Sequence, residues 1–189
     1  MNIFQKIWNW IRGLFGWKDS IVPPSPLPSS GLWTIAYSSG VPTSMSDGFD
    51  FPNLPGSVHY VYRSPDSPNR NGLRLRYRID GSDLYPTEGD SPAALRLFVQ
   101  RAGDNLSAQG EYANYRFWSP RTDLATGEFT VEFPLSGWTN VWGQADEAGL
   151  QRTLADLQNV GFTFGGNFAG HGVYTTTQAR FNLLEFTIL

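Results

Sequence analysis

The sequence contains no cysteine and only two lysines, two histidines and two methionines among its 189 residues. Without cysteine, disulfide frameworks, thiolate zinc sites and cysteine nucleophiles are excluded, so stability must come from packing. His59 and His171 are the only histidines that a Ser-His-Asp arrangement could use, and no G-x-S-x-G motif accompanies them. The net charge of -3 and the pI near 5.3 give no basic field, which argues against a nucleic-acid partner.

Charge and proline divide the chain into two parts. Lys6, Arg12 and Lys18 against Asp19 give residues 1–30 a charge of +2, whereas 11 arginines against 16 acidic residues give the remainder -5. Between them, residues 20–30 carry four prolines in six positions, which forbids a helix and favours an extended spacer. We therefore predict three segments: residues 1–19, a proline-rich linker at 20–30, and one domain at 31–189.

Residues 1–19 predict an amphipathic helix with a wide apolar face, because apolar residues recur at spacings of three and four. We expect this face to anchor the chain through Ile3, Phe4, Ile7, Trp8, Trp10, Ile11, Leu14 and Phe15. Lys6 and Arg12 interrupt the apolar run, so neither a secretory signal nor a transmembrane helix is indicated. The surface it meets could be a partner protein, further copies of the helix, a membrane surface or the chain's own domain.

Residues 31–189 have the pattern of an all-β domain, with short runs of alternating apolar and polar residues separated by turn residues. The predicted strands are residues 32–36, 48–51, 57–63, 73–80, 94–100, 112–119, 127–134, 161–165 and 179–188. One crossover helix is predicted at 146–157, where Leu150, Leu154 and Leu157 share a face. This order predicts a two-sheet antiparallel β-sandwich, or jelly roll.

The order of these elements resembles the jelly-roll carbohydrate-binding modules of the galactose-binding-like group. The resemblance covers about residues 31–189, and it lies in the overall pattern rather than in an invariant motif. The segments that carry it are 49–52, 58–62, 127–135, 138–143, 160–166 and 181–188. It implies a carbohydrate ligand, and it also implies a structural calcium ion held by Glu185 near the end of the last strand, with Asp50 or Asp47 as its partner.

Candidate catalytic carboxylates are present but no motif brings two of them together. Paired-carboxylate hydrolysis needs an acid and a base facing each other across the bound sugar. The acidic segment at residues 80–83, with Glu88 and Asp90, suits either turn chemistry or an oxygen-ligand calcium site. We therefore predict that the protein is not an enzyme.

Three arginines, Arg74, Arg76 and Arg78, alternate with apolar residues and should line one face of their strand. They predict either an ion-pair lattice with Glu128 and Glu132 or a site for an acidic polysaccharide. Sugar recognition also needs flat aromatic rings beside polar side chains. On these grounds the predicted ligand contacts are Trp118, Arg116, Trp142, Tyr85, His171, Asn140 and Arg76. For His171 the alternatives are a loop imidazole bonded to a carbonyl or a metal ligand.

These features predict a non-catalytic carbohydrate-binding module that the N-terminal helix displays on a larger assembly, such as a phage or virus-like particle. The expected partners are a host-surface glycan and a capsid or other assembly protein, with homo-oligomers through the helix as a further option. The expected location is the virion surface or another extracellular surface. Three alternatives stay open: a capsid decoration or spike protein without a sugar site, a bacterial protein held at a membrane surface, and a polysaccharide lyase or hydrolase.

Overall fold

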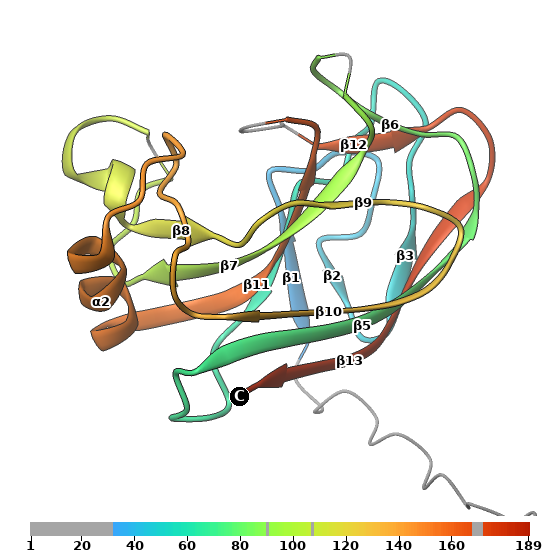
Figure 1. Cartoon of the computed structure of the whole chain (residues 1–189). Helices are drawn as coiled ribbons and strands as arrows, with labels where there is room; N and C mark the ends of the chain where they lie inside the picture. Colours follow the sequence, from blue (N-terminus) through green and yellow to red (C-terminus); the bar gives the residue numbers. More distant parts are fainter. Residues whose placement is uncertain (1–31, 90, 107, 168–171) are drawn as a thin grey trace, which may run out of the picture.

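The computed structural model describes residues 32–189 except residues 90, 107 and 168–171. The predicted anchoring helix, the linker and His171 therefore lie outside the described residues. Within them the protein is mostly β, built of several antiparallel sheets and consistent with a β-sandwich (Figure 1). No helix in this part of the chain has both the length and the apolar character to cross a membrane.

The larger sheet has seven strands in the order β2-β1-β4-β11-β7-β8, with β9 also paired to β7. Every pairing in it is antiparallel. The bounds are β1 Trp33–Ala36, β2 Ser44–Met45, β4 Tyr60–Arg63, β7 Ala94–Arg101, β8 Arg116–Trp118, β9 Thr122–Asp123 and β11 Leu157–Gly165.

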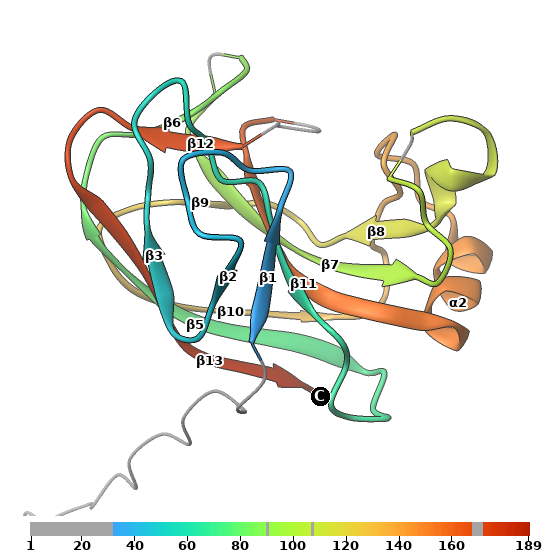
Figure 2. The ribbon, with the colours of Figure 1, turned by 180° about the vertical axis from the view of Figure 1, so that it is seen from behind.

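A second sheet of four strands has the order β10-β5-β13-β3, and a two-stranded pair, β12-β6, lies beside the larger sheets (Figure 2). The bounds are β3 Gly48–Asp50, β5 Gly72–Gly81, β6 Leu84–Pro86, β10 Gly127–Pro134, β12 Val173–Thr175 and β13 Ala179–Ile188. The helical elements are the 3-10 helix η1 at Gly110–Asn114 and the α-helix α2 at Glu147–Ala155.

Alternation along the strands separates the core from the surface. Leu73, Leu75, Tyr77 and Ile79 of β5 are at most 1% exposed, whereas the arginines between them point outward. Aromatic rings fill much of the space, since the centroid of the Phe181 ring lies 5.2–5.5 Å from those of four core neighbours, Phe49, Tyr77, Phe162 and Phe164. Full burial of each such side chain stabilises the fold by roughly 1.5–3 kcal/mol.

The predicted helix is confirmed and is slightly shorter than expected. Asp146 caps it, because its carboxylate accepts a hydrogen bond of 2.8 Å from the Gly149 backbone N–H. Leu150 and Leu154 are buried in the main core. Leu157, predicted to belong to the helix, instead begins β11.

One predicted strand is wrong in its first half. Residues 112–119 divide into the end of η1 and the short strand β8. In η1 the chain turns, and the Tyr115 backbone N–H donates to the Tyr112 carbonyl at 3.2 Å. The aromatic residues there satisfied a strand pattern, but local hydrogen bonding determines the conformation.

Candidate functional site

The arginine row of β5 lies on the outer face of the four-stranded sheet, and the predicted ion-pair lattice is confirmed. Arg74 contacts Glu132 and Arg76 contacts Glu128, both at 2.7 Å across β5 and β10. Hydrogen bonding to Glu132 and its charge raise the pKa of Arg74 above its ordinary value. Arg78 pairs instead with Asp80 of its own strand at 3.1 Å.

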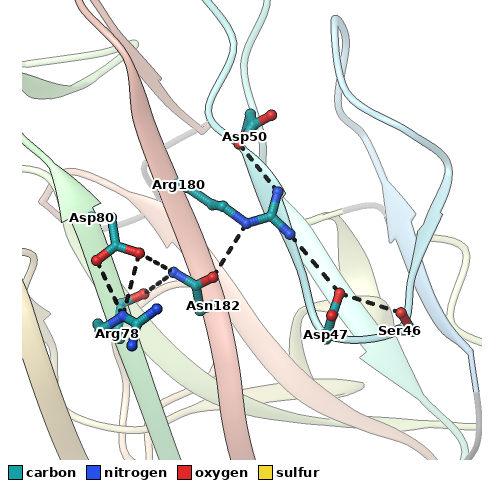
Figure 3. A network of polar contacts seen from close by, with 7 residues as sticks. All are labelled: Ser46, Asp47, Asp50, Arg78, Asp80, Arg180 and Asn182. Atoms are coloured by element: carbon teal, nitrogen blue, oxygen red, sulfur yellow. Dashed lines mark hydrogen bonds and ion pairs between the residues drawn. The ribbon is translucent and has the colours of Figure 1, made fainter.

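The lattice continues across β13 to β3 (Figure 3). Arg180 lies between Asp50 at 3.2 Å and Asp47 at 3.9 Å, and it also donates to the Asn182 side-chain oxygen. Asn182 in turn donates to Asp80 at 2.9 Å. Arg74, Arg76, Arg78 and Arg180 thus each have a carboxylate partner, so this face offers little uncompensated positive charge to an acidic polysaccharide.

The two predicted calcium ligands are not brought together. Asp50 lies opposite Arg180 in the sheet, whereas Glu185 lies five residues further along β13, opposite Arg76. Glu185 accepts a hydrogen bond of 2.9 Å from the Thr187 hydroxyl. Across the described ranges, no group of three or more histidine, aspartate and glutamate side chains is placed to hold a metal ion.

Arg116 and Trp118 lie on the outer face of the larger sheet, opposite the main core that holds Phe117, but loops cover them. Arg116 is 3% exposed and forms an ion pair of 3.0 Å with Asp104, whose side chain is fully buried. Trp118 is 6% exposed and packs in a small second core with Tyr60, Phe98, Ala113 and Val141. We therefore correct their assignment as ligand contacts and assign both a structural role.

Asn140 is likewise a structural residue, since it is 2% exposed and orders the loop before α2. Its side-chain oxygen accepts hydrogen bonds from the backbone N–H groups of Trp142 at 2.9 Å and Gln144 at 3.0 Å. Its amide nitrogen donates to the Asn114 side-chain oxygen at 2.6 Å. The loop that it fixes presents Trp142, which is 56% exposed. Trp142 thus remains available to a ligand, whereas Asn140 does not.

Tyr85 is the predicted contact that the structure places at a pocket. It is 43% exposed on β6 and faces Tyr174, its cross-strand partner on β12, with ring centroids 5.8 Å apart. Beside it lies an open pocket of about 230 Å³, here called the Tyr85 pocket. Its lining residues are Gly81, Ser82, Asp83, Leu84, Tyr85, Leu124, Ala125 and Thr126.

Hydrogen bonds hold the wall of the Tyr85 pocket in place. The Thr175 and Thr177 hydroxyls both donate to the Ser82 carbonyl, at 3.2 and 3.3 Å, and the Thr126 hydroxyl donates to the Gly81 carbonyl. Asp83 has a positive φ of 58°, a conformation that aspartate tolerates better than most residues. The exposed Asp83 carboxylate accepts a hydrogen bond from the Ser82 hydroxyl at 3.1 Å. The pocket therefore joins an aromatic pair to a preformed polar loop.

The predicted residues fall into separate groups. Trp118, Asn140 and Trp142 lie around one end of the larger sheet, where Trp118 exchanges backbone hydrogen bonds with Thr139. Tyr85 lies on the β6–β12 pair, away from β8 in both views (Figures 1 and 2). Asp83 and Thr126 of the pocket were not predicted as ligand contacts. The acidic turn at 80–83 was a signal for the first, and the sequence holds none for the second.

Comparison of the chain with protein-family models, with curated proteins and with solved structures finds no match in any of the three.

Proposed function

We propose that this chain is a non-catalytic carbohydrate-binding module whose sugar site is the Tyr85 pocket. The observation that carries the proposal is the exposed Tyr85, which packs against the half-buried Tyr174 beside an open pocket that also presents a carboxylate. The C–H face of a pyranose packs on an aromatic ring, while carboxylate and hydroxyl oxygens bond the sugar hydroxyls. A neutral sugar ring lying against Tyr85, with Asp83 accepting from its hydroxyls, uses both features.

The non-catalytic part of the proposal is supported by the composition of the pocket. Asp83 is the one carboxylate among the residues that line it. Most glycoside hydrolases place two carboxylic residues on either side of the scissile bond. A single acid suits hydrogen bonding to a sugar better than bond cleavage.

The jelly-roll class and the display on a larger assembly belong to the same proposal. The antiparallel sheets support the first, because two such sheets that pack face to face form the body of a jelly roll. The second depends on residues 1–19, whose apolar pattern suits docking to a capsid or other assembly protein at a virion or other extracellular surface.

Glycan-array screening of the full chain, followed by calorimetric titration of the sugars that bind, tests the proposal. Tyr85→Ala should weaken binding about tenfold or more, which corresponds to about 1.4 kcal/mol. Tyr37→Ala is the matched control, because Tyr37 is an exposed tyrosine, at 62%, that does not line the pocket. Absence of saturable sugar binding, or equal binding by both variants, would refute the site and favour a structural protein.

Two further measurements separate the remaining alternatives. Trp142→Ala should leave sugar affinity unchanged, and a loss there would move the site to the loop before α2. Incubation with a panel of polysaccharides should release no product, and product formation that Asp83→Asn abolishes would identify an enzyme instead.

A further inference from the structure

The outer face of the larger sheet carries a second arrangement of polar and aromatic side chains. In the register of β4, β11 and β7, Tyr60 is opposite Thr163, and Thr163 is opposite Arg96. Side chains opposite each other in adjacent antiparallel strands lie about 4.5–5.5 Å apart at Cβ. These three residues, here called the Arg96 row, therefore form a continuous line across three strands. Both views show β7 and β11 running between the β6–β12 pair and α2 (Figures 1 and 2).

Arg96 is a half-buried cation with no carboxylate partner among the described residues. Its guanidinium donates from Nη1 to the Ser119 carbonyl at 3.0 Å. An arginine carries five N–H donors, and most of those of Arg96 are left for other partners. Burial and the charge of nearby Arg121 both lower the pKa of Arg96. A guanidinium in such surroundings gains from a bound anion.

Arg121 adds positive charge to this region, but most of its N–H donors already have partners. Its side chain donates to Asp123 at 2.8 Å, to the Asn167 side chain at 2.9 Å and to the Pro92 carbonyl at 3.1 Å. Arg121 is thus held by the protein, and it acts on Arg96 only through its field. The two arginines and Asp123 together leave one net positive charge, which favours a bound anion.

Thr163 supplies a second donor beside Arg96. It is 6% exposed, and in the described part of the chain its hydroxyl Oγ1 is buried without a hydrogen-bond partner. A buried hydroxyl without a partner costs roughly 1–3 kcal/mol of stability. A bound oxyanion would satisfy it, since a threonine O–H donates readily to sulfate or carboxylate oxygen.

The other arginines do not share this environment. Those of the four-stranded sheet have carboxylate partners. Arg70, which also has no carboxylate partner within the described residues, donates to three backbone carbonyls, those of Ser67, Asn69 and Leu154. The net charge of -3 gives the whole molecule no attraction for polyanions, so an anion would have to be held by direct contacts.

We propose that Arg96 and Thr163 form a binding site for a single oxyanion, the sulfate or carboxylate group of an acidic saccharide. The identity of the carrier as a saccharide rests on the proposed function, whereas the anion site itself does not. Arg96 supplies forked hydrogen bonds and charge, Thr163 supplies a hydroxyl donor, and Tyr60 continues the row on the other side of Thr163.

Titration of the full chain with inorganic sulfate at constant ionic strength tests the anion site directly. Binding is followed by calorimetry and by the arginine Nε–H resonances in NMR. We expect saturable binding that Arg96→Gln weakens at least tenfold and that Arg74→Gln, a matched variant of an ion-paired arginine, leaves unchanged. Absence of saturable binding, or equal loss in both variants, would overturn the proposal.

Two more variants test the site even if the Arg96→Gln protein does not fold. Arg96→Lys keeps the charge but loses the planar fork, so it should bind sulfate with intermediate affinity. Thr163→Val removes only the hydroxyl, and it should weaken sulfate binding severalfold without lowering the unfolding midpoint. Sulfate affinity that is unchanged in Thr163→Val would remove Thr163 from the site.

Whether the oxyanion belongs to a saccharide is tested by comparing a sulfated oligosaccharide with its desulfated counterpart. The sulfated form should bind at least tenfold more tightly to the wild type, and this preference should disappear in Arg96→Gln. Equal binding of both forms would overturn the saccharide assignment. Tyr85→Ala should leave inorganic sulfate binding intact, so failure of the Tyr85 pocket and failure of the anion site give different results.

Discussion

The buried ion pair between Asp104 and Arg116 should be among the costliest polar contacts to break in this protein. The Asp104 side chain is fully buried and accepts hydrogen bonds from Arg116 at 3.0 Å, Gln100 at 2.9 Å and the Leu106 backbone N–H at 2.8 Å. Asp104→Asn keeps the shape but removes the charge that faces a guanidinium only 4% exposed. Removing one partner of a buried pair costs about 3–5 kcal/mol. For a chain of this size that corresponds to a fall in Tm of roughly 6–20 °C.

Urea unfolding followed by tryptophan fluorescence measures this loss. Glu132→Gln is the control, because it breaks the exposed pair with Arg74 and should cost only about 0–1 kcal/mol. The double variant Asp104→Leu with Arg116→Met should recover most of the loss, since it leaves no buried charge. If Asp104→Asn costs no more than Glu132→Gln, the reasoning from burial is refuted.

Three further outcomes follow from single positions. Gly161→Ala should lower the free energy of unfolding by roughly 1–3 kcal/mol, because the new Cβ would lie 2.1 Å from the Val61 carbonyl oxygen. The urea midpoint should fall while the m-value stays the same, and an unchanged midpoint would contradict the close approach of β11 and β4. Burial raises the pKa of both Tyr60 and Tyr77 to about 12, above an unfolded value of about 10, so stability should be complete below about pH 10 and fall towards pH 12. Tyr77→Phe should reduce that alkaline loss, and urea midpoints measured from about pH 9 to 11 would show whether it does. Asn140→Ala should lower the free energy of unfolding by about 1–3 kcal/mol and speed proteolysis near Trp142, because two backbone N–H groups lose their acceptor. Cleavage at the wild-type rate would count against this structural role of Asn140.

The long strands could be predicted from the sequence because their alternation is long enough to be unambiguous. Residues 127–134 and 179–188 coincide with β10 and β13, and the lattice of Arg74 and Arg76 with Glu132 and Glu128 followed from the same period of two. The short strands β2, β6, β9 and β12 were missed. Two or three residues carry no periodicity, so only their pairing partners define them.

The candidate site was predictable only in part, for a related reason. Alternation puts Arg116 and Trp118 on the same face of their strand, but it cannot say which loop folds over that face. The buried Asp104 comes from such a loop. Tyr85 was predicted as a contact because it follows a turn and is aromatic, whereas Thr126, which also lines the pocket, comes from a distant part of the chain.

The position of β13 has a consequence for how the protein is made. It lies between β5 and β3 and is hydrogen-bonded to both, although it is the latest of the described strands in sequence. During synthesis, the edges of β5 and β3 that pair with β13 therefore stay unpaired until residues 179–188 have left the ribosome. Chains shortened before Ala179 should accumulate as aggregates, and a chaperone that shields strand edges would act on this protein late in translation.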